Sequence, residues 1–256
     1  MDYQDILARL KTDRFGKEIV NFQTIDSTSS HAKILASEGA EEGTVVIAEE
    51  QLHGRGRQGR SWHATPGKNL TFSLILRPKI DISQIGMIPL FAGVAVLLGI
   101  QSATGNTLSL KWPNDILHDG RKICGILVES VVFRHELSAV VVGIGLNVNE
   151  RDFPPSLRNT SASLVMDGRP DLDRASILAK ILLHLEQMYP LLQPARKAEL
   201  ISLWTQHCRH IGKEITVHDA GEMIHGVALG IADDGGLMLE TEDGIKKIIS
   251  GEVPLA

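Results

Sequence analysis

Three apolar, strand-like runs follow one another closely between residues 108 and 148, and their spacing limits the folds open to the chain. The runs cover residues 108–112, 123–133 and 137–148, with the turn-like sequences HDGRK and FRHEL between them. Parallel strands need crossover connections of a dozen or more residues, whereas antiparallel strands need only a short turn. The spacing therefore predicts an α+β fold with a mixed or antiparallel sheet backed by helices.

Helix and strand signals alternate through the rest of the first 210 residues. The DSTS sequence at 26–29 offers capping side chains before an apolar period that ends at Gly39, which predicts a helix between them. Alternation in NLTFSLIL predicts a half-buried strand at 69–76, and a further strand is expected at 44–48. Helical spacing of apolar residues predicts three further helices, at 83–103, 171–192 and 195–208.

The most apolar stretch, residues 85–100, is 16 residues long and contains Pro89 and three glycines. A membrane-spanning helix needs about 20 mostly apolar residues, so we expect a buried helix here and no contact with a membrane. The first 20 residues carry acidic and basic side chains throughout, which argues against a secretory signal. Cys124 and Cys208 lie far apart in sequence, as suits a reducing compartment, and we expect a cytoplasmic protein.

The composition changes at about Ile211. Beyond it, short β-type runs such as EITVH and MIHGVALGI alternate with glycine or aspartate turns, a pattern typical of a small β-barrel. We therefore expect a larger domain over 1–210 and a small C-terminal β-barrel over 211–256. About 45 residues are few for an independently stable unit, so the barrel is expected to pack on the larger domain.

Residues 54–60 read GRGRQGR, placing three arginines among three glycines on a chain whose formal net charge is −5. Glycine lets a backbone approach a ligand closely, and arginine matches carboxylate or phosphate oxygens with paired donors. The loop is therefore predicted to bind an anion, although a solvated surface loop has the same composition. The spacing also matches the G-x-G-x-x-G fingerprint, but Pro66 and Gly67 follow where that fingerprint needs a helix, so a dinucleotide site is rejected.

Four longer segments carry a resemblance to a known family. They are DSTS at 26–29, EEQLHGRGRQGRSW at 49–62, KWPNDILHDGRKICGILVE at 111–129 and GIGLNVN at 143–149. Together with SGEV at 250–253, they closely resemble the biotin protein ligases over most of the chain. The resemblance implies a catalytic domain with the fold of class II aminoacyl-tRNA synthetases, followed by the small barrel.

The resemblance also implies a reaction and its partners. Biotin would be activated with ATP to biotinyl-5′-AMP, with Mg²⁺ accompanying the ATP. The biotinyl group would then pass to a lysine of a biotin carboxyl carrier protein domain, as in acetyl-CoA carboxylase.

Two features depart from the family. Many members read DSTN where this chain has Ser29, a change that keeps a capping side chain and alters one contact to the substrate. Bifunctional members carry an N-terminal helix-turn-helix domain, whereas 25 residues precede Asp26 here. The resemblance therefore implies a monofunctional ligase with no specific DNA binding.

The matching positions imply roles for particular residues. Joining a carboxylate to a triphosphate brings two anions together, and Arg55, Arg57 and Lys122 match the positions whose positive charge offsets this. Arg55 is expected near the biotin carboxylate and the adenylate phosphate, with Arg60 as a further contributor. The other expected contacts to biotin or the adenylate are Ser27, Thr28, Ser29, Gln51, Gly54, Gly56, Trp62, Gly125 and Asn147.

The KWPND segment is turn chemistry by composition alone. The resemblance implies that Lys111 and Asn114 place the nucleotide or Mg²⁺ and that Asp115 lies near the attacking lysine. That lysine has an ordinary pKa of about 10.4 and must lose a proton, so Asp115 is a candidate acceptor. The implied catalytic residues are Arg55, Lys111, Asp115 and Lys122.

Other residues have two interpretations. Ser27 and Thr28 are contacts to biotin or a plain helix cap, and Trp62 covers the adenine or anchors the loop by packing. Residues 53–63 are expected to be mobile without ligand and to become ordered over the adenylate. Cys124 has no evident histidine partner and is expected to be a core residue.

Several alternatives stay open. The His207, Cys208 and His210 cluster lacks further ligands at zinc-site spacing and predicts a helix end, so no metal-binding side chains are expected. A lipoate or octanoate-type protein ligase would share the architecture, and a non-catalytic RNA-binding module would use the arginine–glycine loop differently. A free edge of the central sheet could support a homodimer.

Overall fold

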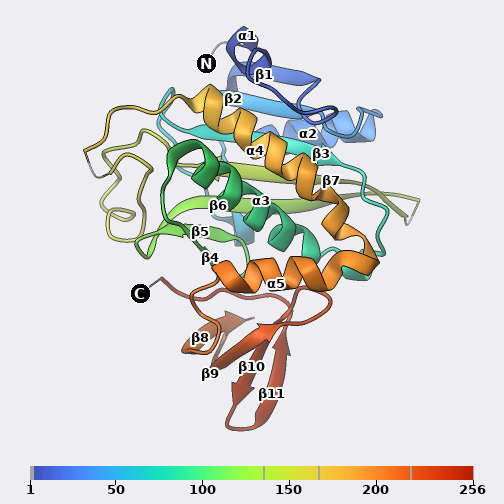
Figure 1. The fold of residues 1–256 in the computed structure, drawn as a ribbon, viewed down its shortest axis with the longest axis vertical. Helices are drawn as coiled ribbons and strands as arrows, with labels where there is room; N and C mark the ends of the chain where they lie inside the picture. Colours follow the sequence, from blue (N-terminus) through green and yellow to red (C-terminus); the bar gives the residue numbers. More distant parts are fainter. Residues whose placement is uncertain (1–2, 135, 167, 220, 256) are drawn as a thin grey trace.

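The computed structural model describes residues 3–134, 136–166, 168–219 and 221–255. Their main feature is a seven-stranded sheet of order β1-β2-β3-β7-β6-β5-β4 (Figure 1). Strands β1 and β2 pair in parallel and the other neighbours pair antiparallel, which confirms the predicted mixed sheet in an α+β fold. The strands are β1 (Ile19–Ile25), β2 (Val45–Gln51), β3 (Leu70–Leu76), β4 (Ser109–Lys111), β5 (Asp115–His118), β6 (Arg121–Phe133) and β7 (Glu136–Leu146).

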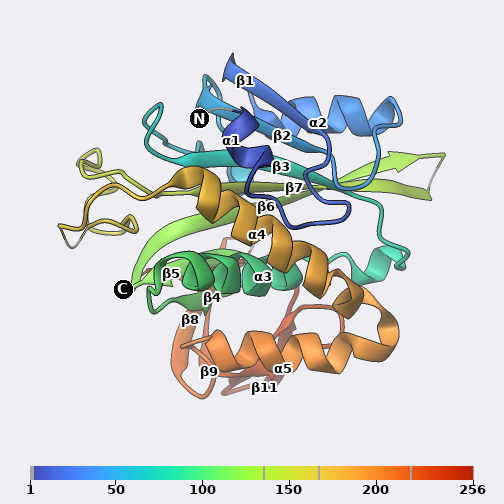
Figure 2. The ribbon, with the colours of Figure 1, turned by 45° about the horizontal axis from the view of Figure 1, so that its top comes forward.

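Helices cover both faces of this sheet (Figure 2). Helix α2 packs on one face, where Ala32 and Ala36 contact apolar residues of β2, β3 and β7. Helices α3 and α4 pack on each other over the opposite face, which holds the larger core. The helices are α1 (Tyr3–Leu7), α2 (Thr28–Ser37), α3 (Met87–Thr104), α4 (Arg174–Met188) and α5 (Lys197–His207).

Alternation along β7 explains why one face of the sheet is hollow. Successive side chains of a strand point to opposite faces. Val140, Val142 and Ile144 enter the core under α3, whereas Ala139 and Val141 pack under α2. The next two positions on the α2 face are glycines, at 143 and 145, and position 125 of neighbouring β6 is a third. The sheet therefore presents a floor without side chains at and beyond the N-terminal end of α2.

The predicted turn HDGRK joins β5 to β6. Asp119 (φ 50°) and Gly120 (φ 80°) both have left-handed backbone conformations, which a two-residue type I′ hairpin turn requires. The predicted turn FRHEL includes residue 135, which lies outside the described residues, but β6 and β7 on either side pair antiparallel. Strands β1 and β5 were not predicted from the sequence.

Helix α3 begins at Met87 and ends at Thr104, close to the predicted bounds. By length and composition it could cross a membrane, but most of its residues are buried between the sheet and helices α4 and α5. The prediction of a core helix is therefore confirmed. In the described chain before β1, the secondary structure is the short helix α1.

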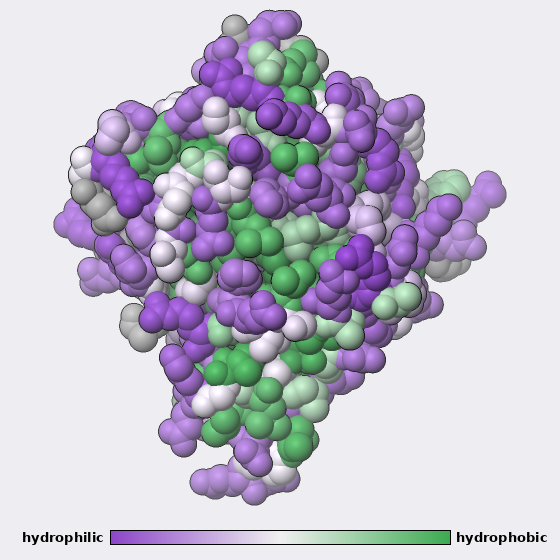
Figure 3. All heavy atoms as spheres, in the orientation of Figure 1, coloured by the Kyte–Doolittle hydropathy of each residue, from purple (hydrophilic) through white to green (hydrophobic). Residues whose placement is uncertain are grey.

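The C-terminal residues form a separate antiparallel sheet of order β11-β10-β9-β8. It packs on the larger domain, where β9 contacts α5, through a continuous core to which Val217 and Leu239 belong. A Cβ on Gly86 would lie 2.3 Å from Asp234 O, so the contact between the two parts is tight. On the face in Figure 3, hydrophobic side chains gather near the bottom, over this sheet. Its strands are β8 (Glu214–Asp219), β9 (Glu222–Ile231), β10 (Leu237–Thr241) and β11 (Gly244–Ile248).

Candidate active site

A cavity of about 220 Å³ lies over the glycine floor of β6 and β7. The arginine–glycine loop, the start of α2, the segment 153–161 and Glu252 supply its walls. Most of the predicted contacts line it: Thr28, Ser29, Gln51, Arg55, Gly56, Arg57, Trp62, Asp115, Lys122, Gly125 and Asn147. Ser27, Gly54 and Lys111 are buried behind these walls.

The arginine–glycine loop folds back on itself as a tight hairpin. The Gly56 amide donates to Arg60 O (2.7 Å), and the Trp62 amide donates to Gly54 O (2.9 Å). Gly59 has φ 72°, a conformation that favours glycine, and a Cβ on Gly54 would lie 2.8 Å from Trp62 O. The next strand or helix is β3, so the helix that a dinucleotide fingerprint needs does not follow.

Arg55 points to an acidic residue that the sequence analysis did not select. Its Nη1 lies 3.0 Å from Glu129 Oε1 on β6, and Lys33 Nζ on α2 lies 2.6 Å from the same oxygen. The single charge of Glu129 is therefore shared between Arg55 and Lys33 and offsets only part of their positive charge. This arrangement anchors the loop to the sheet and to α2. The expected place of Arg55 near the biotin carboxylate and the adenylate phosphate stays a prediction.

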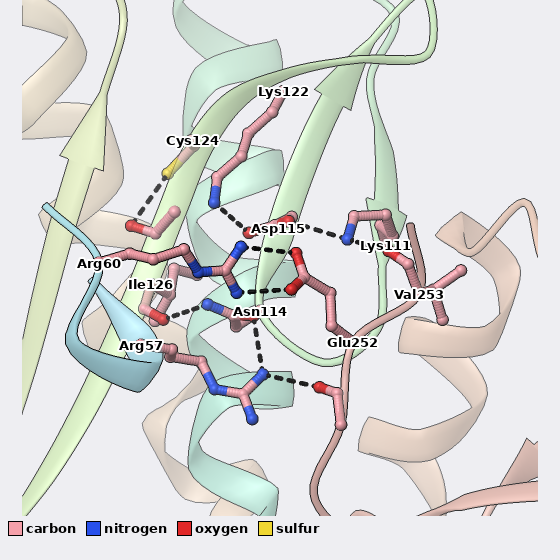
Figure 4. A network of polar contacts seen from close by, with 12 residues as sticks. Arg57, Arg60, Lys111, Asn114, Asp115, Lys122, Cys124, Ile126, Glu252 and Val253 are labelled. Carbon is pink, nitrogen blue, oxygen red and sulfur yellow. Dashed lines mark hydrogen bonds and ion pairs between the residues drawn. The ribbon is translucent and has the colours of Figure 1, made fainter. Parts of the chain in front are cut away.

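Arg57 and Arg60 contact the C-terminal segment (Figure 4). Arg60 forms a paired ion contact with both carboxylate oxygens of Glu252. Arg57 instead donates to two neutral oxygens, Asn114 Oδ1 at 3.3 Å and Gly251 O at 3.2 Å. Burial lowers the pKa of the Arg57 guanidinium, although Asp115 and Glu252 act in the opposite direction. Of the three loop arginines, Arg57 is the one whose hydrogen bonds go to uncharged groups.

Asp115 lies between two lysines (Figure 4). Lys122 Nζ is 2.7 Å from Oδ1 and Lys111 Nζ is 3.0 Å from Oδ2, while Asp115 itself is 5% exposed. Burial would raise the pKa of Asp115, but Lys122 and Lys111 outweigh it and hold that pKa below its ordinary value. Lys111, also buried, donates to Val253 O at 2.7 Å. Asp115 thus aims Lys122 at the cavity, and Lys111 joins Asp115 to the C-terminal segment.

The Trp62 indole lies over the glycine floor. A Cβ on Gly145 would be 2.3 Å from Trp62 Cε2, and one on Gly125 would be 3.0 Å from Trp62 Cζ3. Lys122 Nζ lies 5.7 Å from the ring centroid, within the range of a cation–π contact. The glycines and the tryptophan are therefore complementary parts of one wall.

Polar groups gather where α2 meets β3. Gln51 Oε1 accepts from the Thr28 amide (2.8 Å) and from Thr28 Oγ1 (3.1 Å). Ser73 on β3 donates to Thr28 Oγ1 (2.9 Å) and lies 3.1 Å from Ser29 Oγ. Ser27 is the N-cap of α2 and accepts from the Ser30 amide, so its cap role is observed.

Asn147 closes another part of the cavity. Its Nδ2 donates to Ala162 O at 3.0 Å, and its buried Oδ1 has no hydrogen-bond partner among the described residues. A buried acceptor is costly when unpaired, so this oxygen is available to a donor on a ligand. Asn149, in contrast, is occupied by the backbone of Leu172.

Several positions at the cavity were missed from the sequence. Gly143 and Gly145 had a readable signal, because two glycines at a spacing of two in an apolar strand remove side chains from one face. Glu129, Ser73 and Glu252 had none, because their roles come from contacts between residues far apart in the chain. The segment 153–161 also carries no motif that predicts a cavity wall.

Cys124 and the cluster of His207, Cys208 and His210 do not line the cavity. Cys124 is fully buried, and burial raises the pKa of its thiol, which opposes thiolate formation. Helix α5 ends at His207, as predicted for the cluster that includes Cys208 and His210. Within the described ranges, no group of three or more His, Cys, Asp or Glu side chains could hold a metal ion.

Two family models match the chain. The model described as the Biotin/lipoate A/B protein ligase family matches residues 21–147, and the Biotin protein ligase C terminal domain matches residues 210–255. The Bifunctional ligase/repressor BirA of Bacillus spizizenii is 39% identical over 253 residues, or 98% of this chain and 78% of the relative. The Biotin–[acetyl-CoA-carboxylase] ligase of Paracoccus denitrificans is 31% identical over 89% of this chain and 96% of the relative.

A solved structure agrees with these relatives. The biotin protein ligase from Aquifex aeolicus in complex with biotin and ATP superposes with a TM-score of 0.81 at 30% identity, covering 94% of this chain and 99% of that one. The fold described above is thus that of a class II synthetase-like ligase. The chain belongs to the Biotin/lipoate A/B protein ligase family, and its relatives group it with the biotin protein ligases. These matches do not favour a lipoate ligase or an RNA-binding module.

Proposed function

We propose that this chain activates biotin with ATP and transfers it to a lysine of a biotin carboxyl carrier domain. The biotin carboxylate oxygen attacks the α-phosphorus of ATP, so that biotinyl-5′-AMP forms and pyrophosphate leaves. The acceptor amine then attacks the acyl carbon, AMP leaves, and the amine proton is lost. The observation that carries this proposal is one cavity with a hydrogen-bonding group at one side and cations at the other.

The sheet sets the distance between those two sides. Thr71 on β3 pairs with Gly145, Gly145 with Gly125, and Gly125 with Asp115 on β5. Adjacent strands lie about 4.8 Å apart, so this row spans about 14 Å. An extended acid with a polar ring can therefore place its ring near Ser29 and its carboxylate near Lys122.

The cationic side supplies the charge that adenylation needs. Arg57 and Lys122 would stabilise the negative charge that develops as carboxylate and phosphate approach. Trp62 covers the floor on this side and would exclude water from the mixed anhydride. We assign Asp115 to orienting Lys122 rather than to accepting the proton of the attacking lysine, because a carboxylate with a lowered pKa is a poor base.

Magnesium would enter with the nucleotide. Asn114 Oδ1 and the carboxylates of Asp115 and Glu252 would offer oxygen ligands at the cavity wall. The amide oxygen accepts from Arg57, and both carboxylates are paired with cations. This donor set fits an ion held mainly by the ATP phosphates with one or two protein oxygens. When bound, Mg²⁺ would neutralise phosphate charge and assist departure of pyrophosphate.

The proposal extends to organisation and setting. Residues 1–210 would hold both substrates, and residues 211–256 would brace the nucleotide side through Gly251, Glu252 and Val253. Strand β1 lies at one edge of the larger sheet, where a homodimer could pair. Use of ATP and two free cysteines suit the cytoplasm.

Mass spectrometry of an acceptor tests the function. The chain is incubated with ATP, a biotin carboxyl carrier domain, and either biotin or lipoate. The proposal expects the mass of one biotinyl group on a single lysine, and no lipoyl adduct. Lipoylation without biotinylation would reject it, and a Lys-to-Arg change at the acceptor position is the matched control.

A further inference from the structure

Ser73 lies directly behind the ring-binding side of the cavity and is fully buried. It is on β3 and contacts Thr28 and Ser29 at the start of α2. Thr28 and Ser29 are themselves 3% and 5% exposed. Ser73 is therefore shielded from water, and Thr28 and Ser29 expose little beyond the parts that line the cavity. Each hydroxyl hydrogen should accordingly find a partner within the protein or on a ligand.

The hydrogen bonds run in one direction. Gln51 Oε1 can only accept, so the Thr28 hydroxyl donates to it. Thr28 Oγ1 must then accept from Ser73, which uses the single hydrogen of the Ser73 hydroxyl. In the contact between Ser29 and Ser73, Ser29 is consequently the donor.

Among the described residues, this order leaves the Ser29 lone pairs without a donor and commits its hydrogen to Ser73. A Cβ on Gly143 would lie 2.4 Å from Ser29 Oγ, so the hydroxyl is held against the bare floor of the cavity. The same chain of hydrogen bonds fixes the orientation of the Gln51 side-chain amide, because its Oε1 accepts from Thr28. The Nε2 of Gln51 therefore offers donors at the cavity wall. An acceptor and a donor presented together match a group that has both N–H and C=O, such as a cyclic urea.

We propose that Ser73 is a positioning residue that determines ligand specificity by fixing Ser29 as a hydrogen-bond acceptor. This inference rests on the proposed function, because the cyclic urea is that of biotin. Without the Ser73 hydroxyl, the Ser29 hydrogen loses its acceptor and turns towards the ligand. The Ser29 hydroxyl would then point a donor at the ring N–H, which is also a donor. The preference for a ligand that carries this N–H would be lost.

Calorimetric titration of the full chain with biotin, in the absence of ATP, tests this inference. Ser73→Ala is expected to raise the Kd for biotin about ten-fold, as for a lost buried hydrogen-bond partner. Ser29→Ala is expected to have a similar effect, and the double variant is expected to match either single one, because Ser73 acts through Ser29. Ser73→Thr keeps the hydroxyl and should bind biotin more tightly than Ser73→Ala, close to the natural chain.

A second readout separates positioning from a general structural role. The probe is biotin with a methyl group on one ureido nitrogen, tested as both regioisomers. The natural chain should bind one regioisomer at least about ten-fold more weakly than biotin, and Ser73→Ala should reduce that ratio. Thr71→Val is the matched control. It removes a buried hydroxyl group from the same face of β3, but that hydroxyl donates to Ala48 O and not to Thr28 or Ser29.

The outcomes are distinct. Strictly additive effects of Ser29→Ala and Ser73→Ala, an unchanged methyl-biotin ratio in Ser73→Ala, or an equal loss in Thr71→Val would overturn the inference and leave the proposed function intact. Absence of biotin binding by the natural chain would overturn the proposed function itself.

Discussion

The Trp62 indole occupies the space in which a side chain on Gly145 would lie. A Cβ on that glycine would be 2.3 Å from Trp62 Cε2, a distance that real contacts do not show. The loop that carries the arginines is thereby docked on the floor of the cavity by steric fit as well as by charge.

Gly145→Ala should displace the indole and loosen the loop. We expect the KM for ATP to rise about ten-fold, because positioning of the cations is lost. Tryptophan fluorescence can follow the displacement, since Trp112 and Trp204 are each 1% exposed and Trp62 lines the cavity. In a Trp62→Ala background the same glycine change should have little further effect, and a full additional loss there would contradict the steric explanation.

The two arginines at the start of the loop should differ. Arg57→Ala is expected to lower the adenylation rate by a factor of about 100 to 1,000, as for loss of a group that stabilises developing charge. Arg55→Ala should reduce that rate less and instead increase proteolysis of the loop, because Arg55 is bonded to Glu129. Pyrophosphate exchange measures the rate, and limited proteolysis with a protease that does not cleave after arginine measures the loop. A larger rate loss for Arg55→Ala would reverse this assignment.

Asp115→Asn should destabilise the fold at neutral pH. Removing one partner from a buried ion network costs about 3–5 kcal/mol, and Lys111 would be left buried without its counter-ion. Because the folded-state pKa of Asp115 is lowered, its contribution is present above the unfolded value of about 3.9 and is lost as the pH falls through the folded value.

Denaturant unfolding of Asp115→Asn and the natural chain measures this contribution. The stability difference should be full at pH 7 and should shrink only below about pH 4. Asp119→Asn, whose side chain is 77% exposed in the β5–β6 turn, is the control and should be close to neutral. A difference that disappears between pH 7 and pH 5 would show that the pKa of Asp115 is not lowered.

Glu252→Gln should affect the nucleotide and spare biotin. It breaks the paired contact with Arg60, through which the C-terminal segment holds the loop. We expect a several-fold higher KM for ATP and an unchanged Kd for biotin, because Glu252 lies away from Ser29 and Ser73. Glu242→Gln, in the turn between β10 and β11, is the control. An equal weakening of biotin binding would show that the loop serves both substrates together.

The fold could be predicted where local pattern and burial agree. Strand β3 followed from alternation and helix α3 from a continuous apolar run. The prediction that β3 is half-buried was wrong, because all seven of its residues are buried between layers of the fold. Strand β1 was missed because, at a sheet edge, much of it is exposed, and polar residues dilute its pattern. Strand β5 was missed because it begins at Asp115 within KWPND, whose composition indicates a turn.

The site could be predicted in its residue types but not in its pairings. Motifs selected Arg55, Arg57 and Lys122 correctly as cavity residues. They did not reveal that Glu129 holds Arg55, or that Lys111 is buried and bonded to Val253. Such contacts join segments far apart in sequence, and a single sequence carries no direct signal for them.

The most direct test of the central claim is the exchange of labelled pyrophosphate into ATP, measured with biotin, lipoate and octanoate in parallel. It reports adenylation of the acid without any need for the acceptor protein. We predict exchange with biotin, at a rate lowered strongly in Arg57→Ala, and none above background with the two acids that lack a cyclic urea. Exchange with lipoate or octanoate in place of biotin would keep the fold and contradict the account of its specificity, and absence of exchange with all three would contradict the proposed reaction.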